Sequence, residues 1–427
     1  MTMRRYPPTP SWCMSGPMRT AQMLATALTF ALAFDTGCTV TTSSSSTPPG
    51  GSDPTAGKPI ETAEPASKPL PPEKPDSKVE AKKKYDEAIA ELEAEYKTEA
   101  ARWTPELRAQ AAKLTGTKWR NTGMALKAAL ASEHRRPNHA SRDPFRHPAE
   151  TMAFFGLKPS MSVFEVGPGA GWWTELLAVV LSAKGTLAIA TFDTKSDDLS
   201  TAYFARATEL MLETAPELYG KVERVQNSAP GNYEMGAAES RDMVLCTRMA
   251  HNLIRSKGLE KFLAQAHDAL EVGGVLAIEQ HRAPEGADPT TSAEKGYVPE
   301  AWLIAQVEAA GFKLDKKSEI NANAKDTKDY PKGVWTLPPN FAEGDKDKAK
   351  YEAIGESDRM TLRFVKPKAP KAKTPDATLK ADTGKVDAGK VDAKKKVAPK
   401  AIIKAADAPA EKPLEKPTEK PTEKPTK

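Results

Sequence analysis

The sequence predicts an α/β domain built on a mostly parallel seven-stranded sheet, with one antiparallel hairpin at an edge of that sheet. Short apolar runs alternate with amphipathic segments from Gly156 to the run at 360–365. A glycine-rich turn joins the first run to the first helix, and no helix is predicted between the last two runs. Strands that alternate with helices form parallel sheets with right-handed crossovers, whereas two strands in direct succession favour an antiparallel pair.

Two amphipathic helices are expected ahead of this domain, in the segment 78–122. Between 79 and 102, four apolar residues spaced by four, three and four positions form one stripe on an otherwise charged helix. Thr104 followed by Pro105 indicates an N-cap and a first-turn proline that begin another helix. These helices either pack on the main domain, which is the simpler expectation, or pair with a partner protein.

The elements of the main domain follow in order. The expected strands are 162–166, 186–191, 222–226, 242–247, 275–280, 313–320 and 360–365. The expected helices are 172–182, 199–218, 259–270 and 299–310, the third of them stopped by Gly273-Gly274. A long insertion, 321–358, contains YPKGVWTLPPNF, whose aromatic residues and prolines predict an ordered loop. Loops of this length are commonly functional.

The N-terminus, residues 1–38, has the pattern of an export leader. Basic residues precede the apolar run Met23–Phe34, which is too short to span a membrane. Thr36-Gly37-Cys38 resembles the end of a bacterial lipobox, although Asp35 stands where an aliphatic residue is usual. We therefore expect an envelope lipoprotein anchored in the membrane at Cys38, or else a plain periplasmic or secreted protein. Replacing Cys38 with serine separates the two, because only an anchored protein would leave the membrane fraction.

Two polar segments flank the predicted domains. Residues 39–77 are mostly Ser, Thr, Pro and Gly, which predicts a disordered tether, and residues 368–427 form a disordered Lys-, Pro- and Ala-rich tail. From Lys366 onward there are 17 lysines and 9 acids, an excess of eight positive charges; the whole chain carries +5, so the remainder is net −3. The basic charge therefore belongs to the tail, which we expect to be a spacer or a cell-wall contact. The predicted domain has no charge excess that would favour nucleic acid.

The stretch VFEVGPGAGWWTELL, residues 163–177, joins a strand to a helix through Gly167, Gly169 and Gly171. Alternating glycines let a ligand approach the backbone closely. A dinucleotide would place its pyrophosphate here, and the carboxylate of Glu165 would repel it. S-adenosylmethionine has no phosphate and carries a cationic sulfonium and amino group, so an acid at this strand end suits it.

The strand, the motif E-x-G-x-G-x-G, the helix and the terminal antiparallel hairpin together resemble the class I S-adenosylmethionine-dependent methyltransferases. Further segments are similar to a family of predicted bacterial methyltransferases. They are SRDPFRHPAETMAFFGLKP (141–159), EVGPGAGWWTELLA (165–178), RMAHNL (248–253), LEVGGVLAIEQHRA (270–283), the stretch 296–339 with GVWTLPP, and GESDRMTLRFVKP (355–367). The resemblance implies a Rossmann-like methyltransferase domain over 123–367, with S-adenosyl-L-methionine as cofactor.

The resemblance also implies cofactor contacts. Glu165 and the three glycines carry over directly, and of the two tryptophans that open the first helix we assign Trp172 to the cofactor. The second strand of such folds normally ends in an acid that holds the ribose, but here Asp193 comes two residues late. An acid after the third strand often contacts the adenine, and here Asn227 stands in its place.

Candidate catalytic residues follow the fourth and fifth strands, because ligands of open α/β sheets lie beyond the carboxyl ends of the strands. His251 is a candidate general base, Asn252 a candidate for orienting the acceptor, and Arg248 a candidate for holding an acidic group. The alternative is a structural turn with a hydrogen-bonded histidine. His281, followed by Arg282, is expected to face the same crevice.

The charged residues upstream of the first strand have two interpretations. Arg142, Asp143, Arg146 and His147 either cap a helix and form salt bridges or cover the cofactor as a lid. The histidines of the chain lack compact ligand spacing and cysteine partners, so no metal is expected.

Two functions stay open on this sequence. The first is a methyltransferase that moves a methyl group from S-adenosylmethionine to a small-molecule or envelope acceptor. The second is a non-catalytic envelope protein that keeps the fold as a binding module. The altered acids after the second and third strands favour the second, as does export away from the cytosol, where the cofactor is made.

Overall fold

The computed structural model describes residues 77–229 and 231–368. The leader with Cys38, nearly all of the tether and the Lys-rich tail lie outside the described residues. Export, lipidation at Cys38 and a cell-wall contact of the tail therefore stay predictions. Among the helices of the described ranges, none has the length and apolar character needed to cross a lipid bilayer.

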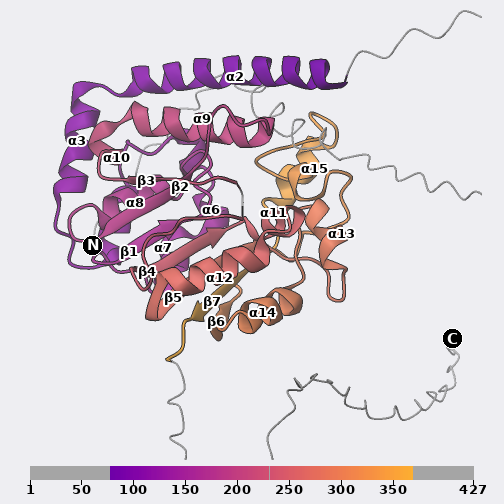
Figure 1. The fold of residues 1–427 in the computed structure, drawn as a ribbon. Coiled ribbons are helices and arrows are strands. Elements are labelled where there is room, and N and C mark those ends of the chain that lie inside the picture. The colour runs from indigo at the N-terminus through magenta and orange to yellow at the C-terminus, as the bar shows by residue number, and fades with distance from the viewer. Residues whose placement is uncertain (1–76, 230, 369–427) are drawn as a thin grey trace, which may run out of the picture. The chain divides into compact units, whose positions relative to one another are not determined.

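Seven strands of the described chain form one sheet in the order β3-β2-β1-β4-β5-β7-β6 (Figure 1). They are β1 (Ser162–Glu165), β2 (Thr186–Thr191), β3 (Glu223–Gln226), β4 (Arg241–Thr247), β5 (Leu270–His281), β6 (Lys313–Ser318) and β7 (Arg359–Val365). β1 to β5 pair in parallel, and β7 is antiparallel to both of its neighbours, β5 and β6. This order and these directions are those of the class I methyltransferase fold, so the predicted fold class is confirmed.

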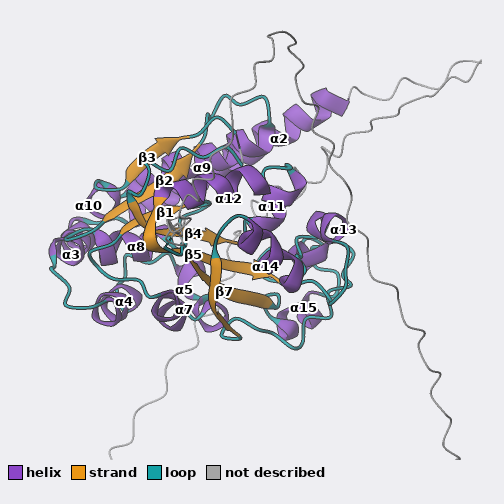
Figure 2. Cartoon of the chain, turned by 60° about the horizontal axis from the view of Figure 1, so that its bottom comes forward, coloured by secondary structure: helices purple, strands orange, loops and turns teal. Residues whose placement is uncertain are grey.

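Helices cover both faces of the sheet (Figure 2). Those before β4 are α2 (Ser77–Arg102), α3 (Pro105–Gly116), α4 (Thr122–Leu130), α5 (Pro137–Ala140), α6 (Asp143–Arg146), α7 (Pro148–Phe155), α8 (Thr174–Leu181), α9 (Leu199–Thr214) and α10 (Pro216–Tyr219). Those after β4 are α11 (Ala250–Arg255), α12 (Leu259–Ala269), α13 (Pro289–Glu294), α14 (Glu300–Ala309), the 3₁₀ helix η1 (Gly333–Thr336) and α15 (Lys348–Ile354).

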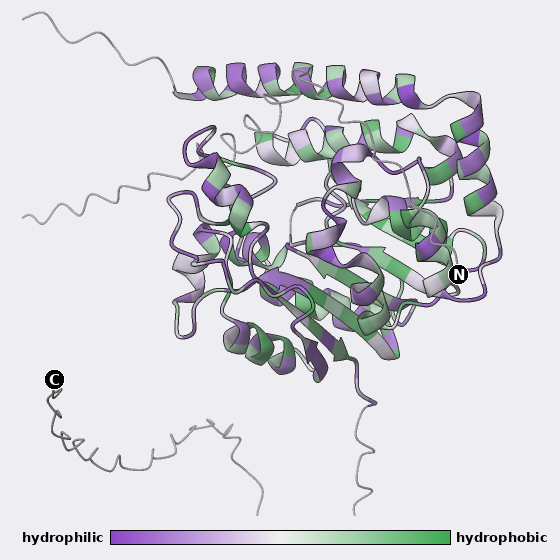
Figure 3. Cartoon of the chain, turned by 180° about the vertical axis from the view of Figure 1, so that it is seen from behind, coloured by the Kyte–Doolittle hydropathy of each residue, from purple (hydrophilic) through white to green (hydrophobic). Residues whose placement is uncertain are grey.

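The apolar residues of the strands divide between two cores because successive side chains point to opposite faces. In β1, Val163 packs with α2–α4 and α7–α10, whereas its neighbour Phe164 packs with α11, α12 and α14. Most of these inward strand residues are fully buried. Figure 3 shows the central strands as mostly hydrophobic and the outer helix α2 as largely hydrophilic. The two cores lie on the two faces of the sheet, and the candidate site lies at one end of its strands.

Helix α2 packs on the main domain, as the simpler expectation had it. Leu92 and Tyr96 of the predicted stripe are buried, while Tyr85 and Ile89 pack against the same core at partial exposure. The helix lies beside α9 (Figure 1), and the Glu93 carboxylate forms an ion pair with Arg206 at 2.9 Å. Helix α3 begins as predicted, with the Thr104 hydroxyl accepting the Leu107 N–H and Pro105 in the first turn.

Several expected boundaries are wrong, and strand β6 ends at Ser318 and not at Ile320. The expected helix 199–218 breaks into α9 and α10, because Pro216 has no N–H and holds Ala215 at φ −141 and ψ 79, outside the helical region. Strand β5 starts at Leu270 and not at Val275, because its first residues pair with β4 and the Gly273 N–H donates to the Lys366 carbonyl. The first helix after the glycine turn begins at Thr174, two residues later than expected.

The long insertion is ordered, but it contains helices that were not expected. η1 and α15 both lie between β6 and β7. Asn321 fastens the start of the insertion, because its Nδ2 donates to the Thr151 and Thr361 hydroxyls at 3.1 and 3.0 Å. The prediction of an antiparallel β6–β7 pair is nevertheless correct.

Candidate active site

The carboxyl ends of β1, β2, β4 and β5 lie at one edge of the sheet, because these strands are parallel. Strand β7 runs the opposite way and begins at this edge, with Arg359 paired to His281. Side chains that follow the parallel strands therefore meet side chains that precede β7. The glycine turn and every predicted catalytic residue belong to this edge.

Glu165 ends β1 and is almost fully buried. Its Oε2 accepts a hydrogen bond of 2.8 Å from the Thr174 hydroxyl at the start of α8. Burial raises the pKa of Glu165 to about 7, although this hydrogen bond and the nearby charge of Arg248 oppose the rise. An approaching cation would favour the ionised form, so this carboxyl is suited to a positively charged ligand.

The three glycines of the turn have different roles. Gly169 has a φ of +53, and a side chain added there would meet no atom within 4 Å. Gly171 has a φ of +87, and an added Cβ would lie 2.0 Å from the Met211 sulfur, so its absence lets the turn pack on α9. At Gly167 an added Cβ would lie 2.6 Å from the Met249 Cγ. Only Gly169 therefore leaves open space in which a ligand can approach the backbone.

Trp172 does not have the environment that was expected for a cofactor contact. Its ring is buried, its Nε1 donates to the His139 carbonyl at 2.9 Å, and the Arg146 guanidinium lies 4.8 Å from the ring centroid. Trp173 is buried as well and packs edge-on against Trp172. Both rings belong to the core beneath the turn, because the amphipathic face that follows the glycines packs inward.

The two altered positions after β2 and β3 are occupied by local hydrogen bonds. Asp193 is exposed and its Oδ1 accepts the Lys195 N–H at 2.8 Å, which forms a turn. Asn227 is buried; its Nδ2 donates to the Val225 carbonyl at 2.6 Å and its Oδ1 accepts the Glu234 N–H at 2.8 Å. Asn227 thus connects the loop after β3 to the sheet, and its side chain has little capacity left for an adenine. Asp193 is exposed, and its Oδ2 makes no hydrogen bond among the described residues.

The four predicted catalytic residues line one cavity of about 180 Å³. Arg248, His251 and Asn252 come from the end of β4 and α11, and His281 comes from the end of β5. The remaining walls are Arg142, Arg146, Glu356, Ser357 and the insertion residues Val334, Trp335, Pro338, Pro339 and Asn340. The structure therefore brings together all four predicted residues with the long insertion. A larger cavity of about 420 Å³ lies at the opposite strand ends, beside Glu223 and Arg241.

Both histidines of this cavity are held neutral. Burial lowers the pKa of His251 to about 4, and its Nδ1 lies 3.3 Å from the Gln280 Nε2. Burial, together with the neighbouring His251, places the pKa of His281 well below its ordinary value, and its Nδ1 contacts the Ser357 hydroxyl at 2.5 Å. At neutral pH each ring can accept a proton or a hydrogen bond. A pKa near 4 makes His251 a weaker base than the sequence suggested.

Arg248 has an unusual backbone conformation for a residue with a side chain. Its φ is +55, and its N–H donates to the Glu279 carbonyl at 2.7 Å. Non-glycine residues in this left-handed region are strained and occur preferentially at functional sites. Among the described residues, its guanidinium has no hydrogen-bond or ion-pair partner. It is nevertheless close enough to Glu165 and Glu356 to lower the pKa of both.

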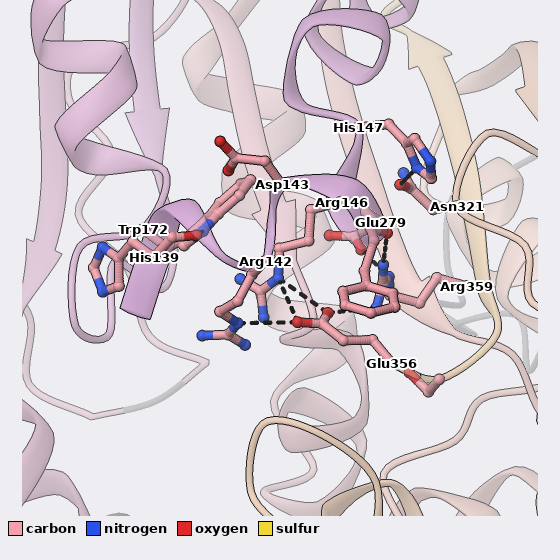
Figure 4. Close-up of polar contacts among 12 residues, drawn as sticks. His139, Arg142, Asp143, Arg146, His147, Trp172, Glu279, Asn321, Glu356 and Arg359 are labelled. Carbon is pink, nitrogen blue, oxygen red and sulfur yellow. Dashed lines mark hydrogen bonds and ion pairs between the residues drawn. The ribbon is translucent and has the colours of Figure 1, made fainter. Parts of the chain in front are cut away.

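Three other arginines surround one carboxylate in this cavity (Figure 4). Arg142 Nε lies 2.9 Å from Glu356 Oε1, Arg146 Nε lies 3.0 Å from Oε2, and Arg359 Nη1 lies 2.8 Å from Oε2. Arg359 Nε also pairs with Glu279 at 2.5 Å. Burial lowers the pKa of Arg142 to about 10, so it remains charged at neutral pH. Although burial opposes it, the charges of Arg142 and Arg359 hold the pKa of Glu356 below its ordinary value.

The upstream charged group thus forms salt bridges, and it also contributes to the cavity. Asp143 pairs with Arg135 at 2.9 Å, and the His147 Nδ1 lies 3.2 Å from the Asn321 Oδ1. Arg142 and Arg146 point into the cavity from α6 and the residue before it. Arg282, by contrast, pairs with Glu300 and Glu319, away from the cavity lining.

Sequence reasoning missed Glu356 and Arg359. The run GESDR stands immediately before the last apolar strand, which is the signal that could have found them. An antiparallel strand begins at the edge where the parallel strands end, so polar residues just before it face the site. Within the described ranges, no group of three His, Cys, Asp or Glu residues is arranged to hold a metal ion.

No known family model matches the chain. A curated relative, the highly reducing polyketide synthase NEC1 of Pyricularia oryzae, is 28% identical over 122 residues, which are 29% of this chain and 4% of that protein. This chain thus matches a small part of a far longer protein.

Several solved methyltransferases are similar to this chain. An S-adenosylmethionine-dependent methyltransferase from Aquifex aeolicus has a TM-score of 0.35 at 17% identity, covering 57% of this chain and 98% of that one. A putative sarcosine dimethylglycine methyltransferase from Galdieria sulphuraria has a TM-score of 0.37 at 13% identity, covering 56% and 90%. Phosphoethanolamine N-methyltransferase 2 of Haemonchus contortus, solved with S-adenosyl-L-methionine, has a TM-score of 0.35 at 15% identity, covering 58% and 57%. Because these TM-scores are low, we assign the fold from the strand order and strand directions. By these, the described domain has the class I methyltransferase fold.

Proposed function

We propose that this protein binds S-adenosylmethionine at the turn after β1 and transfers its methyl group to an acceptor held in the cavity at the ends of β4 and β5. The observation that carries the proposal is the open space at Gly169 beside the buried carboxyl of Glu165. A ligand without phosphate and with positive charge fits this combination. Glu165, Gly167, Gly169 and the free oxygen of Asp193 would hold it.

The chemistry needs little from the side chains. When bound, S-adenosylmethionine supplies a methyl group that is already activated for displacement. The cavity residues then have to hold the acceptor in line and keep water away, which alone accounts for a large rate enhancement. Arg248 and Asn252 are placed to orient the acceptor, and His251, neutral at pH 7, is placed to take a proton from an acidic nucleophile.

A second candidate is the non-catalytic binding module. It is favoured by the hydrogen bonds that occupy Asn227 and one oxygen of Asp193, because these positions would otherwise recognise adenine and ribose. Under this alternative the protein binds the cofactor or a related ligand without turning it over. The cavity with His251 and the strained Arg248 favours the enzyme.

The test is a calorimetric titration of the full-length protein with S-adenosylmethionine. We expect the wild type to bind and Gly169→Val to bind at least about tenfold more weakly, because the new side chain fills the only open approach in the turn. Gly273→Val is the matched control: Gly273 also has a positive φ, +91, and open space around it, but it lies at the opposite end of β5. Failure of the wild type to bind, or equal binding by Gly169→Val, removes the proposal. Binding without turnover across an acceptor screen favours the module.

A further inference from the structure

We propose that the methyl acceptor is a small molecule carrying a carboxylate or phosphate group, bound by the guanidinium groups of Arg142, Arg146 and Arg248. That the bound molecule accepts a methyl group rests on the proposed function. That the bound molecule is an anion rests on the cavity alone. It names a substrate class for a site that otherwise has none.

The first argument is charge. Three arginines line the cavity, whereas Glu356 is the one carboxylate among the lining residues of the described chain. Arg359 and Glu279 are not among the lining residues and form an ion pair, so their charges cancel. The two lining histidines are neutral, because burial lowers the pKa of each. Among the lining residues, two positive charges are therefore left without a balancing carboxylate, which is unfavourable in a largely buried space until an anion enters. The Glu165 carboxyl, which lies within reach of Arg248, balances little of this charge because burial raises its pKa to about 7.

The second argument is an unsatisfied donor. Arg146 is 3% exposed, and its Nε contacts both oxygens of Glu356 at 3.1 and 3.0 Å. Its Nη1 is fully buried and has no hydrogen-bond partner among the described residues. Buried guanidinium donors are nearly always paired, and carboxylates and phosphates pair with them through two parallel hydrogen bonds. The guanidinium of Arg248, which has no hydrogen-bond or ion-pair partner among the described residues, lines the same cavity.

The third argument is size. A volume of about 180 Å³ is smaller than the cavities that usually hold drug-sized ligands, which begin at roughly 300 Å³. Trp335 of η1 closes one side, with its ring 5.8 Å from that of His251. The cavity thus has room for an anionic group on a small body.

The fourth argument is position. Met249, the residue after Arg248, packs directly on Gly167 of the glycine turn. Arg248 lies within electrostatic reach of Glu165 at the turn and of Glu356 in the cavity. An anion held by Arg248 is therefore anchored beside the proposed cofactor site, and the rest of a small acceptor is within reach of it.

The experiment measures anion binding to the full-length protein without the cofactor. Inorganic phosphate and malonate are the probes, and chloride at equal ionic strength is the reference. We expect either probe to raise the melting temperature of the wild type by several degrees more than chloride does. Arg248→Gln should lose this increase without unfolding, because the guanidinium makes no hydrogen bond or ion pair among the described residues that the substitution would break, and Glu356 keeps three arginine partners. Arg224→Gln, which removes an exposed arginine of β3, is the matched control and should keep the increase.

The outcomes of the two experiments distinguish the anion site from the proposed function. If neither probe stabilises the wild type beyond chloride, or if Arg248→Gln keeps the full effect, the anion site is wrong. The cofactor titration described above is independent of it. If S-adenosylmethionine binds but the anions do not, the proposed function stands and the substrate class falls. If the anions bind but the cofactor does not, the proposed function is wrong, and the anion is then not a methyl acceptor.

Discussion

At the end of β1, a carboxyl group is held out of water by the turn that follows it. Glu165 is 1% exposed and accepts one hydrogen bond, from the Thr174 hydroxyl. Burial raises its pKa to about 7 against an ordinary 4.5, so the folded protein resists ionising it. Above pH 7 the charged form destabilises the unliganded protein. A cationic ligand would reverse this effect, because it would stabilise the carboxylate. Binding sites commonly cost a protein some stability in this way.

Glu165→Gln therefore changes stability in a pH-dependent direction. The amide imitates the protonated carboxyl, so at pH 8 we expect the free energy of unfolding to rise by up to about 3 kcal/mol. At pH 5 the wild-type group is protonated in the folded state and mostly ionised only after unfolding, so the gain should be small. Urea unfolding at both pH values measures the difference. The same substitution should weaken S-adenosylmethionine binding, and the exposed Glu150→Gln should change neither quantity.

An increase of stability that is equal at pH 5 and pH 8 would contradict the raised pKa. The cofactor affinity provides a second check. In the wild type it should strengthen, relative to Glu165→Gln, as pH rises through about 7 and the carboxylate forms. A constant ratio between the two proteins from pH 6 to pH 8 would show that Glu165 does not face the ligand's positive charge.

At the scale of elements, α2 is part of the domain although it precedes the sheet by 59 residues, from Arg102 to β1 at Ser162. It lies along α9. Leu92, in the middle of the helix, is 5% exposed and packs in the core, whereas Val79, in the first turn, is 66% exposed. Intrinsic propensity alone seldom holds a single helix in water, so the packed stripe supplies most of its stability. The insertion between β6 and β7 is also held by packing: Val334 of η1 lies in a buried cluster with Ala283 and Tyr297, and its N–H donates to the Lys295 carbonyl at 3.0 Å.

Leu92→Ala tests whether α2 is part of the cooperative unit. We expect the free energy of unfolding to fall by roughly 2–4 kcal/mol, because a buried leucine loses its contacts and leaves a cavity. Val79→Ala, in the same helix but exposed, should change it by less than about 0.5 kcal/mol. Urea unfolding followed by tryptophan fluorescence reports on the sheet domain. If Leu92→Ala leaves the midpoint unchanged, α2 folds independently of the sheet.

At the scale of the whole molecule, His134, His139 and His251 are buried, and burial disfavours their charged form. Burial lowers the pKa of five of the six, to about 4 for His134 and His251. The others are His139, His267 and His281. A base whose folded pKa lies below its unfolded value takes up a proton on unfolding. Its contribution to stability is therefore full above the unfolded value of 6.5 and is lost as pH falls toward the folded value.

Acid should therefore destabilise the protein above the pH range in which carboxylates with ordinary pKa values titrate. Between pH 7 and pH 5, the protonation of His134 and of His251 each lowers the free energy of unfolding by about 2 kcal/mol. The protonation of Glu165 raises it by about 2 kcal/mol over the same range. We expect the free energy of unfolding to fall by at least about 2 kcal/mol over this range, as measured by urea unfolding at fixed ionic strength. A stability that is constant or higher at pH 5 would mean that these histidines are not buried in solution.

The sequence by itself determined the local elements and the place of the glycine turn. A short apolar run placed β2 at 186–191, and Thr104-Pro105 placed the start of α3, because both depend on neighbours in the chain. The order of strands and helices also predicted the parallel sheet with an antiparallel pair, and hence that His251 and His281 would share a cavity. The true positions of Trp172 and Asn227 were not predictable, since their partners come from other segments.

Only the tertiary structure decided the arginine cavity. Arg142 and Glu356 are 214 residues apart, and the sequence around either residue does not predict its contact with the other. They meet because β7 enters the sheet between β5 and β6 in the reverse direction, which brings the residues before it to the edge where β4 and β5 end. The unpaired donor of Arg146 follows from the same packing, because burial and partner geometry exist only once distant segments are in contact.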